Sequence, residues 1–369
     1  MRHLVIAFDG TWEAPDNDFS DGNQNTHVSR LVNHLNSQTL DGVEQMYFYQ
    51  PGVGTHFWDR FRGGVFGWGL SEKILQAYQW LGTHYRFGDK VFLVGYSRGA
   101  YAARSLSGLI DRVGLLKTAH IDRVKDAYSI YRRSQRREAN EFKRRFSDTI
   151  EIEAIAVWDT VGSLGIPLKS FQGLNRHLWQ FHDTKLASNV RNGFHALAID
   201  EHRPDFKPTL WSPNRSEQRI EQRWFAGSHS DIGGGRAESG LSALSFQWMV
   251  SELTNLGLSI EPSHFASSHF NPFDSFNEFL AGIYDLFRDR QYRILGSLPQ
   301  GSEVLDPSVF HLIEKGEYQP KNKVQEYLKP VEGFVGELGR VAESSVRPEV
   351  GHRDLRSFCV QGYDTTLSA

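Results

Sequence analysis

The sequence has only one cysteine, Cys359, among its 369 residues. An internal disulfide framework and a cysteine-rich zinc site are therefore excluded. Long apolar runs are missing too, since none approaches the ~18 residues that a membrane-spanning helix needs. The first apolar run ends at Asp9 and is too short for a signal peptide. We therefore expect a chain that is cytoplasmic as synthesised, and any secretion to follow a signal-independent route.

The chain also has little net charge, with 41 Lys and Arg against 44 Asp and Glu, or −3 in total. This balance excludes a chain-wide basic field for nucleic acid, so we expect no nucleic-acid partner. Residues 123–145 are the exception, because they hold nine Lys or Arg against three Asp or Glu. This segment is either a solvated helix face or a surface for peripheral contact with anionic lipid head groups.

Short apolar runs alternate with helical patterns, which predicts an α/β fold: a mostly parallel sheet with helices on both faces. The expected strands are residues 3–8, 46–49, 90–95, 151–158 and 221–226, and the expected helices are 72–86 and 100–113. Aromatic residues gather in 51–70 and 265–287, where they belong either to the core or to insertions that form lids or walls of an apolar pocket outside the sheet. We expect one domain over 1–369, with a helical cap or lid from about 263 to 330. Active sites in such sheets lie at the carboxyl ends of the strands.

Residues 95–99 read Gly-Tyr-Ser-Arg-Gly, a G-x-S-x-G pattern between an expected strand and an expected helix. That is the context of a nucleophile elbow, where a sharp turn exposes the serine hydroxyl at a helix N-terminus. The pattern predicts that Ser97 is a nucleophile. The alternative is a tight turn in which the serine only caps the helix.

A serine nucleophile needs a base and an acid, and candidates follow two other strands. Asp159 ends the strand 151–158, while His229 and Asp231 follow the strand 221–226 on a glycine-rich loop. We favour His229 as the base and Asp159 as the acid that orients it. An Asx turn at Asp159 and a structural histidine at 229 are the alternatives.

The loop after the first strand and the residue after Ser97 supply the other expected parts of a hydrolase site. The backbone N–H groups of Gly10, Thr11 and Arg98 are candidates for an oxyanion hole. Asp9 could suggest a phosphatase with an aspartate nucleophile, but Ala7 stands where that nucleophile should be.

Several stretches in order along the chain resemble the bacterial and fungal proteins grouped as domain of unknown function 2235. They are FDGTW with NQNTHVSRL (23–31), GYSRGAYAARSLSGLI (95–110), VWDTVGSLG (157–165), RNGFHALAIDEHRPDF (191–206), RWFAGSHSDIGGG (223–235) and the looser GEYQPKN (316–322). The resemblance implies an α/β-hydrolase-like fold, and the group includes phospholipase effectors of type VI secretion. It also implies that Ser97 is a nucleophile surrounded by Asp159, His229 and Asp231.

One departure from the family pattern leaves the base open. A late His-Pro-Ser-Val is common in the family, whereas this chain has Asp306 at the first position and His311 shortly after. If the late histidine were the base, the protein would be inactive or would use His229 or His311 instead.

The sequence thus predicts a serine-dependent lipolytic hydrolase, a phospholipase or carboxylesterase, that acts on a lipid or ester and needs no cofactor or metal. Two rivals stay open. One is a binding protein on a hydrolase scaffold, and the other is a metal-assisted phosphoesterase built from Asp9, Asp159, His229 and Asp231. The sequence does not indicate an oligomeric state.

Overall fold

The computed structural model of the chain describes residues 1–10, 25–52, 63–133, 135–161, 185–212, 217–235, 240–263, 265, 270–278, 289–298 and 302–322. All of them belong to the first of two units, Met1–Lys323. The second unit, Val324–Ala369, lies outside the described residues together with Cys359. The prediction of one domain over the whole chain therefore stays a prediction.

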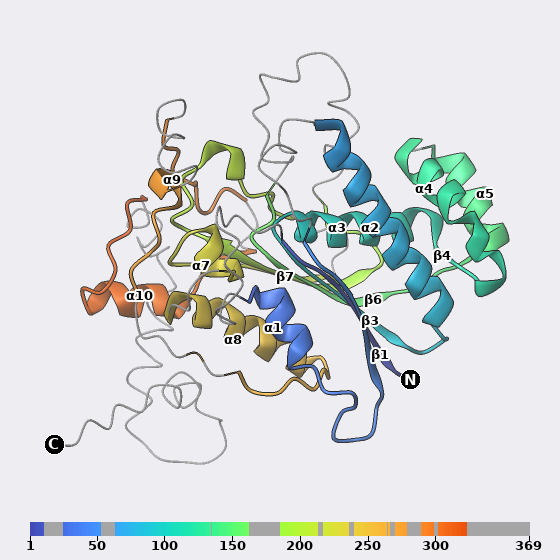
Figure 1. Cartoon of the computed structure of the whole chain (residues 1–369), viewed down its shortest axis with the longest axis horizontal. Coiled ribbons are helices and arrows are strands. Elements are labelled where there is room, and N and C mark those ends of the chain that lie inside the picture. The colour runs from blue at the N-terminus through green and yellow to red at the C-terminus, as the bar shows by residue number, and fades with distance from the viewer. Residues whose placement is uncertain are drawn as a thin grey trace. The chain divides into compact units, whose positions relative to one another are not determined.

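A parallel sheet of seven strands forms the centre of the described structure, in the order β2-β1-β3-β6-β7-β8-β9 (Figure 1). Its strands are β1 (His3–Phe8), β2 (Gln45–Gln50), β3 (Lys90–Tyr96), β6 (Ile152–Trp158), β7 (Val190–Ala198), β8 (Arg219–Phe225) and β9 (Glu303–Leu305). Two-residue strands β4 (Leu115–Leu116) and β5 (Ser147–Asp148) pair antiparallel apart from it.

Helices cover both faces of this sheet (Figure 1). On one face lie α1 (His27–Asn33) and α8 (Gly240–Asn255). On the other lie α2 (Gly63–His84) and α3 (Arg98–Val113), followed outward by α4 (Val124–Arg133) and α5 (Arg136–Phe146). Shorter helices are α7 (His229–Gly233), α9 (Ser275–Glu278), α10 (Pro307–Glu314) and the 3₁₀ turns Thr118–Arg123 and Pro204–Phe206.

The strand β1 shows why this sequence forms a two-sided sheet, since all six of its residues are buried. Leu4, Ile6 and Phe8 pack in the core beneath α2 and α3, whereas Val5 and Ala7 pack in the core beneath α1 and α8. Successive side chains of a strand point to opposite faces, so a continuous apolar run serves both cores. Each fully buried large aliphatic side chain contributes about 1.5–3 kcal/mol to folding.

The strand order reverses next to β1, because the chain goes to β2 on one side of it and then to β3 on the other. In open parallel sheets this reversal leaves a crevice at the carboxyl ends of the two strands. Asp9 follows β1 there, and Ser97 follows β3.

The α/β fold and the five expected strands are confirmed, with ends that differ by up to two residues. The strands β7 and β9 were not expected. The helix expected at 72–86 instead runs from Gly63 to His84, so part of the aromatic segment 51–70 is helical. Within the segment expected to form a cap, Glu303–Leu305 joins the sheet as β9. No described helix is long and apolar enough to span a membrane.

Candidate active site

Ser97 occupies the tight turn between β3 and α3. Its backbone has φ 55° and ψ −117°, a conformation that costs about 1–3 kcal/mol for a residue with a side chain. The turn is held because the Ser97 N–H donates to the Trp158 carbonyl at 3.0 Å and because α3 packs closely on β1. A Cβ on Gly99 would lie only 2.1 Å from the Phe8 carbonyl oxygen, so glycine is required for this approach. The second glycine of the G-x-S-x-G pattern therefore has a steric reason.

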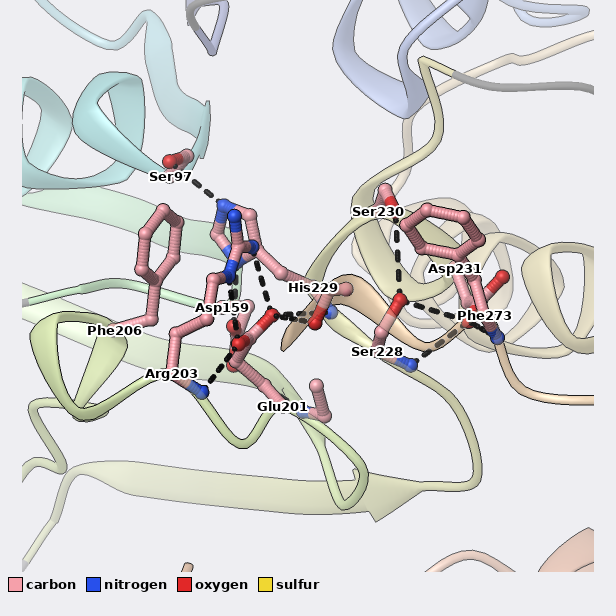
Figure 2. Close-up of polar contacts among 12 residues, drawn as sticks. Ser97, Asp159, Glu201, Arg203, Phe206, Ser228, His229, Ser230, Asp231 and Phe273 are labelled. Atoms are coloured by element: carbon pink, nitrogen blue, oxygen red, sulfur yellow. Dashed lines mark hydrogen bonds and ion pairs between the residues drawn. The ribbon is translucent and has the colours of Figure 1, made fainter. Parts of the chain in front are cut away.

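Three side chains form one continuous line of hydrogen bonds (Figure 2). His229 Nε2 lies 2.8 Å from Ser97 Oγ, and His229 Nδ1 lies 2.6 Å from Asp159 Oδ2. An ionised carboxylate only accepts, so Nδ1 carries the proton and Nε2 is left to accept from the serine hydroxyl. All three residues are buried, with 6%, 3% and 0% of Ser97, His229 and Asp159 exposed. The geometry places an imidazole against the serine hydroxyl and a carboxylate against the imidazole.

Asp159 follows β6 and takes a left-handed backbone conformation, with φ 40°. Besides His229, its carboxylate accepts from the Ala198 N–H at 3.2 Å and from both Nη atoms of Arg293 at 2.6 and 2.9 Å. Burial alone would raise the pKa of Asp159, but the charge of Arg293 and the hydrogen bonds from His229 and Arg293 hold it well below its usual range. Asp159 is therefore ionised at neutral pH.

A second buried ion pair lies beside His229 (Figure 2). Glu201 accepts from Nε and Nη2 of Arg203, each at 2.8 Å, and both side chains are essentially inaccessible. Burial raises the pKa of Glu201, but the Arg203 charge and hydrogen bonds outweigh this and lower the pKa to about 2. Glu201 also accepts from the Arg203 backbone N–H at 2.9 Å, the Ser275 hydroxyl at 2.9 Å and the His229 backbone N–H at 3.4 Å. Glu201 thus ties the start of α7 to the preceding loop.

Aromatic rings enclose the imidazole of His229. The Phe206 ring meets the imidazole edge-on, with ring centroids 5.1 Å apart. The centroid of the Tyr96 ring lies 4.8 Å from that of the imidazole, and the two ring planes are tilted by 33°. The Tyr96 hydroxyl donates to the His229 carbonyl at 3.1 Å. A Cβ on Gly233 would lie 1.9 Å from the Tyr96 ring, which explains a glycine at this point of the Gly-rich loop.

A histidine that the sequence did not single out fixes the turn after Asp159. Nε2 of His195, on β7, accepts from the Thr160 N–H at 3.0 Å. Burial, together with the nearby Arg104 charge, lowers the pKa of His195 to about 3. The ring is therefore neutral at physiological pH and can accept this bond.

Asp231, which the resemblance places around Ser97, contacts the start of α7 and Phe273 in this structure. Its Oδ2 accepts from the Ser228 N–H at 2.8 Å, the Ser228 hydroxyl at 2.9 Å and the Phe273 N–H at 3.0 Å. Ser228 and Asp231 form a capping box at the start of α7. This box satisfies N–H groups that the helix leaves open, and α7 begins at His229.

The three residues expected to form an oxyanion hole are Gly10, Thr11 and Arg98, and this role stays a prediction. The Gly10 N–H donates to the Asp9 carboxylate at 2.7 Å, so it does not fit the predicted role in this structure. Asp9 also accepts from the hydroxyls of Thr26 at 2.7 Å and Tyr49 at 2.6 Å. Thr11 lies outside the described residues. Arg98 begins α3 directly after Ser97, at the end of the helix where N–H groups lack intrahelical acceptors.

Asp306 and His311, the late residues that made the identity of the base uncertain in the sequence, both lie at α10, the first as its N-terminal cap and the second within the helix. Asp306 caps α10 by accepting from the Ser308 N–H at 2.9 Å, and it also pairs with Arg223 at 3.1 Å. His311 is exposed in the last turn of the same helix. The structure places His229, and not His311, against Ser97.

Of the four residues of the metal alternative, Asp159 and His229 contact each other, while Asp9 and Asp231 have other partners. Asp9 is held by Thr26 and Tyr49, and Asp159 by Arg293 and His229. Across the described ranges no group of three or more His, Cys, Asp or Glu could hold a metal ion. This set of residues therefore does not form the proposed metal site.

The late GEYQPKN stretch packs against the loop that carries Glu201. The Tyr318 hydroxyl donates to Asp200 at 2.8 Å, and Asn322 donates to the Ile199 carbonyl at 2.7 Å. Residues far along the chain therefore hold the loop after β7.

Four residues around the site were missed by the sequence reasoning: His195, Glu201, Arg203 and Arg293. His195, Glu201 and Arg203 lie in 191–206, a stretch that resembles the family, and this resemblance could have pointed to them. Arg293 stands alone in an unremarkable segment, and nothing in the sequence marks it.

A comparison with protein-family models places most of the chain in one family. Residues 2–252 match the family described as "T6SS, Phospholipase effector Tle1-like, catalytic domain". The chain is 31% identical over 241 residues to Uncharacterized protein YEL023C of Saccharomyces cerevisiae, a match that covers 58% of this chain and 33% of the yeast protein.

Two solved structures are similar at lower identity. One is an uncharacterized protein from Pseudomonas aeruginosa, with 18% identity and a TM-score of 0.41 over 70% of this chain and 46% of that one. The other is the Tle1 effector bound to the VgrG spike from the Type 6 secretion system, with 20% identity and a TM-score of 0.38 over 64% and 52%. The chain thus spans about a third to a half of the length of these relatives.

The family match covers more than half of the chain, from the first strand to α8. It includes the elbow at Ser97 and the segments that carry Asp159 and His229. The chain therefore belongs to the family of Tle1-like phospholipase effector catalytic domains.

Proposed function

We propose that this protein is a serine-dependent phospholipase that cleaves a carboxylic ester of a lipid. The observation that carries the proposal is the continuous hydrogen-bond line from Ser97 through His229 to Asp159, which begins at a strained elbow. A nucleophile, a base and an orienting carboxylate within hydrogen-bond distance are the parts that acyl transfer needs. Membership of a phospholipase effector family supports a lipid substrate.

In the proposed reaction the Ser97 hydroxyl attacks the ester carbonyl while His229 Nε2 takes its proton. Asp159 keeps the imidazole in the tautomer that accepts this proton and stabilises the positive charge that forms on the ring. His229 then returns the proton to the leaving alcohol. Water, deprotonated by the same imidazole, releases the fatty acid from Ser97.

The negative charge of the tetrahedral intermediate needs donors close to Ser97. The backbone N–H of Arg98 meets this need by position, because it opens α3 and the helix dipole favours negative charge there. The Gly10 N–H would contribute only after leaving Asp9, to which it donates at 2.7 Å.

Peripheral contact with lipid is part of the proposal and rests on 123–145. This segment forms α4 and α5, which pack on α2 and α3 (right side of Figure 1). Their buried side is apolar, with residues such as Ile130 and Phe142, whereas Arg136, Arg137 and Arg144 are exposed. Such a basic face attracts anionic head groups by about 1 kcal/mol for each cation near the surface.

The test is Ser97→Ala, assayed by fatty-acid release from phospholipid–detergent mixed micelles. Loss of the nucleophile should lower kcat by several orders of magnitude. The fold should persist, because Ser97 contributes a strained turn and no cap bond to α3. Ser107→Ala is the matched control, since this buried serine of α3 bonds only to the Arg104 carbonyl among its described partners.

Other outcomes separate the alternatives. Undiminished release by folded Ser97→Ala would refute the serine mechanism. Loss of wild-type release in chelator would favour metal-assisted chemistry instead. A folded wild-type protein that is inert on phospholipids and simple esters would favour a binding protein. Activity that survives His229→Ala but not His311→Ala would show that the base is misassigned.

A further inference from the structure

Arg293 comes from a segment without regular secondary structure, far from the strands that carry the rest of the site. Within residues 289–298 it is the one buried residue, at 8% exposure, while its neighbours Tyr292 and Ile294 are 46% and 78% exposed. Its Nη1 donates to Asp159 Oδ1 at 2.6 Å and to the Ala198 carbonyl at 2.8 Å. Its Nη2 donates to Asp159 Oδ2 at 2.9 Å and to the Phe206 carbonyl at 2.7 Å.

The segment is fixed on both sides of this arginine. Before it, the Gln291 N–H donates to the His202 carbonyl at 2.9 Å, and Arg290 pairs with Asp274 at 3.0 Å. After it, the Glu303 carboxylate accepts from the Gly296 N–H at 3.0 Å and the Leu298 N–H at 2.8 Å. The guanidinium is thus held in place by contacts that do not involve Asp159.

Two properties of this contact bear on the site. A planar guanidinium that bridges both carboxylate oxygens fixes the plane of the carboxylate, which a single point charge would not do. That plane decides whether Oδ2 points at His229 Nδ1. The guanidinium also compensates the negative charge of Asp159. Asp159 is 0% exposed, and a buried carboxylate without a positive partner would lower the stability of the fold.

We propose that Arg293 is a positioning residue of this site, whose fork holds the Asp159 carboxylate in line with His229 and whose charge limits how strongly that carboxylate favours the imidazolium. The inference rests on the proposed esterase function. It also extends the site beyond residue 252, where the family match ends.

The charge effect predicts a pH dependence that can be measured. Several polar or charged groups lie around His229. They come from the end of β3 and the turn after it, the end of β6, the loop after β7 and residues 289–298. They are Tyr96, Ser97, Asp159, Glu201, Arg203 and Arg293. Of these, Arg293 alone both carries a positive charge and touches Asp159 directly in the described structure. Its removal leaves the negative charge of Asp159 uncompensated next to the imidazole.

The experiment compares Arg293→Gln and Arg293→Lys with wild type in the full chain. In Arg293→Gln the acidic limb of the pH profile of kcat/KM should move up by about one unit or more, as expected when a cation within ~6 Å is lost. kcat should fall at least about tenfold with little change in KM, because Asp159 can rotate. Arg293→Lys keeps the charge without the fork, so kcat should fall while the acidic limb stays in place.

The control is Arg2→Gln, which breaks a comparable ion pair, Arg2–Asp89 at 2.7 Å, at the opposite ends of the strands. If Arg293→Gln differs from wild type no more than Arg2→Gln does, the proposal is overturned. Failure of both Arg293 variants to fold would also overturn it, in favour of a purely structural role.

A second readout separates this proposal from the proposed function. The imidazole of His229 can be titrated by NMR in the absence of substrate, with its signals assigned by their loss in His229→Ala. A higher midpoint in Arg293→Gln than in wild type supports the inference even if the wild type hydrolyses no ester. An unchanged midpoint contradicts it even if the wild type is an active phospholipase.

Discussion

The elbow at Ser97 depends on Gly99, and replacing this glycine by alanine gives a sharp test. A Cβ there would lie 2.1 Å from the Phe8 carbonyl oxygen and 2.7 Å from the Asp9 carbonyl oxygen. Both atoms belong to backbone, so neither can rotate away. To reach even 3.0 Å, α3 or β1 must move by about 0.9 Å, which is the gap between that limit and the contact at Phe8.

Overpacking of this kind costs about 1–3 kcal/mol in the free energy of unfolding. A shift of about 1 Å at Ser97, the proposed nucleophile, should also lower the rate roughly 100-fold. Gly69→Ala is the matched control, because Gly69 is a helical glycine of α2 whose Cβ would meet nothing within 4 Å. That change should instead raise the free energy of unfolding by about 0.5–1 kcal/mol and leave kcat unchanged.

Urea denaturation measures the free energy of unfolding of the two variants, and the mixed-micelle assay measures their rates. We expect the two free energies of unfolding to differ by about 1.5–4 kcal/mol, with Gly99→Ala the less stable. Equal stabilities and equal rates would refute the reasoning, since they would mean that α3 does not pack on β1 as closely as described.

Two further predictions concern charge. The first changes the charge of three exposed arginines of α5 from positive to negative, in the triple variant Arg136→Glu, Arg137→Glu and Arg144→Glu. Binding to anionic vesicles should weaken roughly 100-fold at low salt, whereas hydrolysis of a short soluble ester should stay unchanged. A control with the same change of charge reverses Arg86, Lys207 and Lys315, which are also exposed; equal weakening by both variants would show that only net charge matters. Burial raises the pKa of Asp200 to about 6, despite hydrogen bonds from Gly227 and Tyr318. Because this folded-state pKa lies above the unfolded value, the stability that protonation contributes is present below about pH 4 and is lost as pH rises through about 6. Asp200→Asn should therefore gain stability relative to wild type between pH 4 and 7, by up to about 3 kcal/mol in urea denaturation; a difference independent of pH would contradict this.

The parts of the fold that the sequence predicts are those where local composition alone decides the structure. The strands β1, β3 and β6 are unbroken apolar runs buried on both faces, and such runs stand out from helical periodicity. The strand β7 carries Arg191, Asn192 and Gly193 directly after its first residue, Val190, so it has no long apolar run, and β9 has only three residues. Both are strands because neighbouring strands supply their hydrogen bonds, which is tertiary information.

The same distinction applies to the site. Ser97 is predictable because an elbow needs glycines at fixed offsets, and His229 and Asp159 because they follow predicted strands. The capping box of Ser228 and Asp231 is also predictable, since the two residues have the spacing that such a box requires. Arg293 was not predictable, because its role comes only from the folding of a distant loop onto Asp159.

The side chains of the site are gathered from very distant points of the chain. His229 is 132 residues from Ser97 and 70 from Asp159, and Arg293 is 134 residues from Asp159. Contacts of such long range form late and slowly, because many loops must close before parallel strands can pair. In a refolding experiment, helical signal should thus return before hydrolysis does. During synthesis on the ribosome, the nascent chain carries Ser97, Asp159 and His229 long before Arg293 emerges, so the complete geometry of the proposed site is among the last properties the protein acquires.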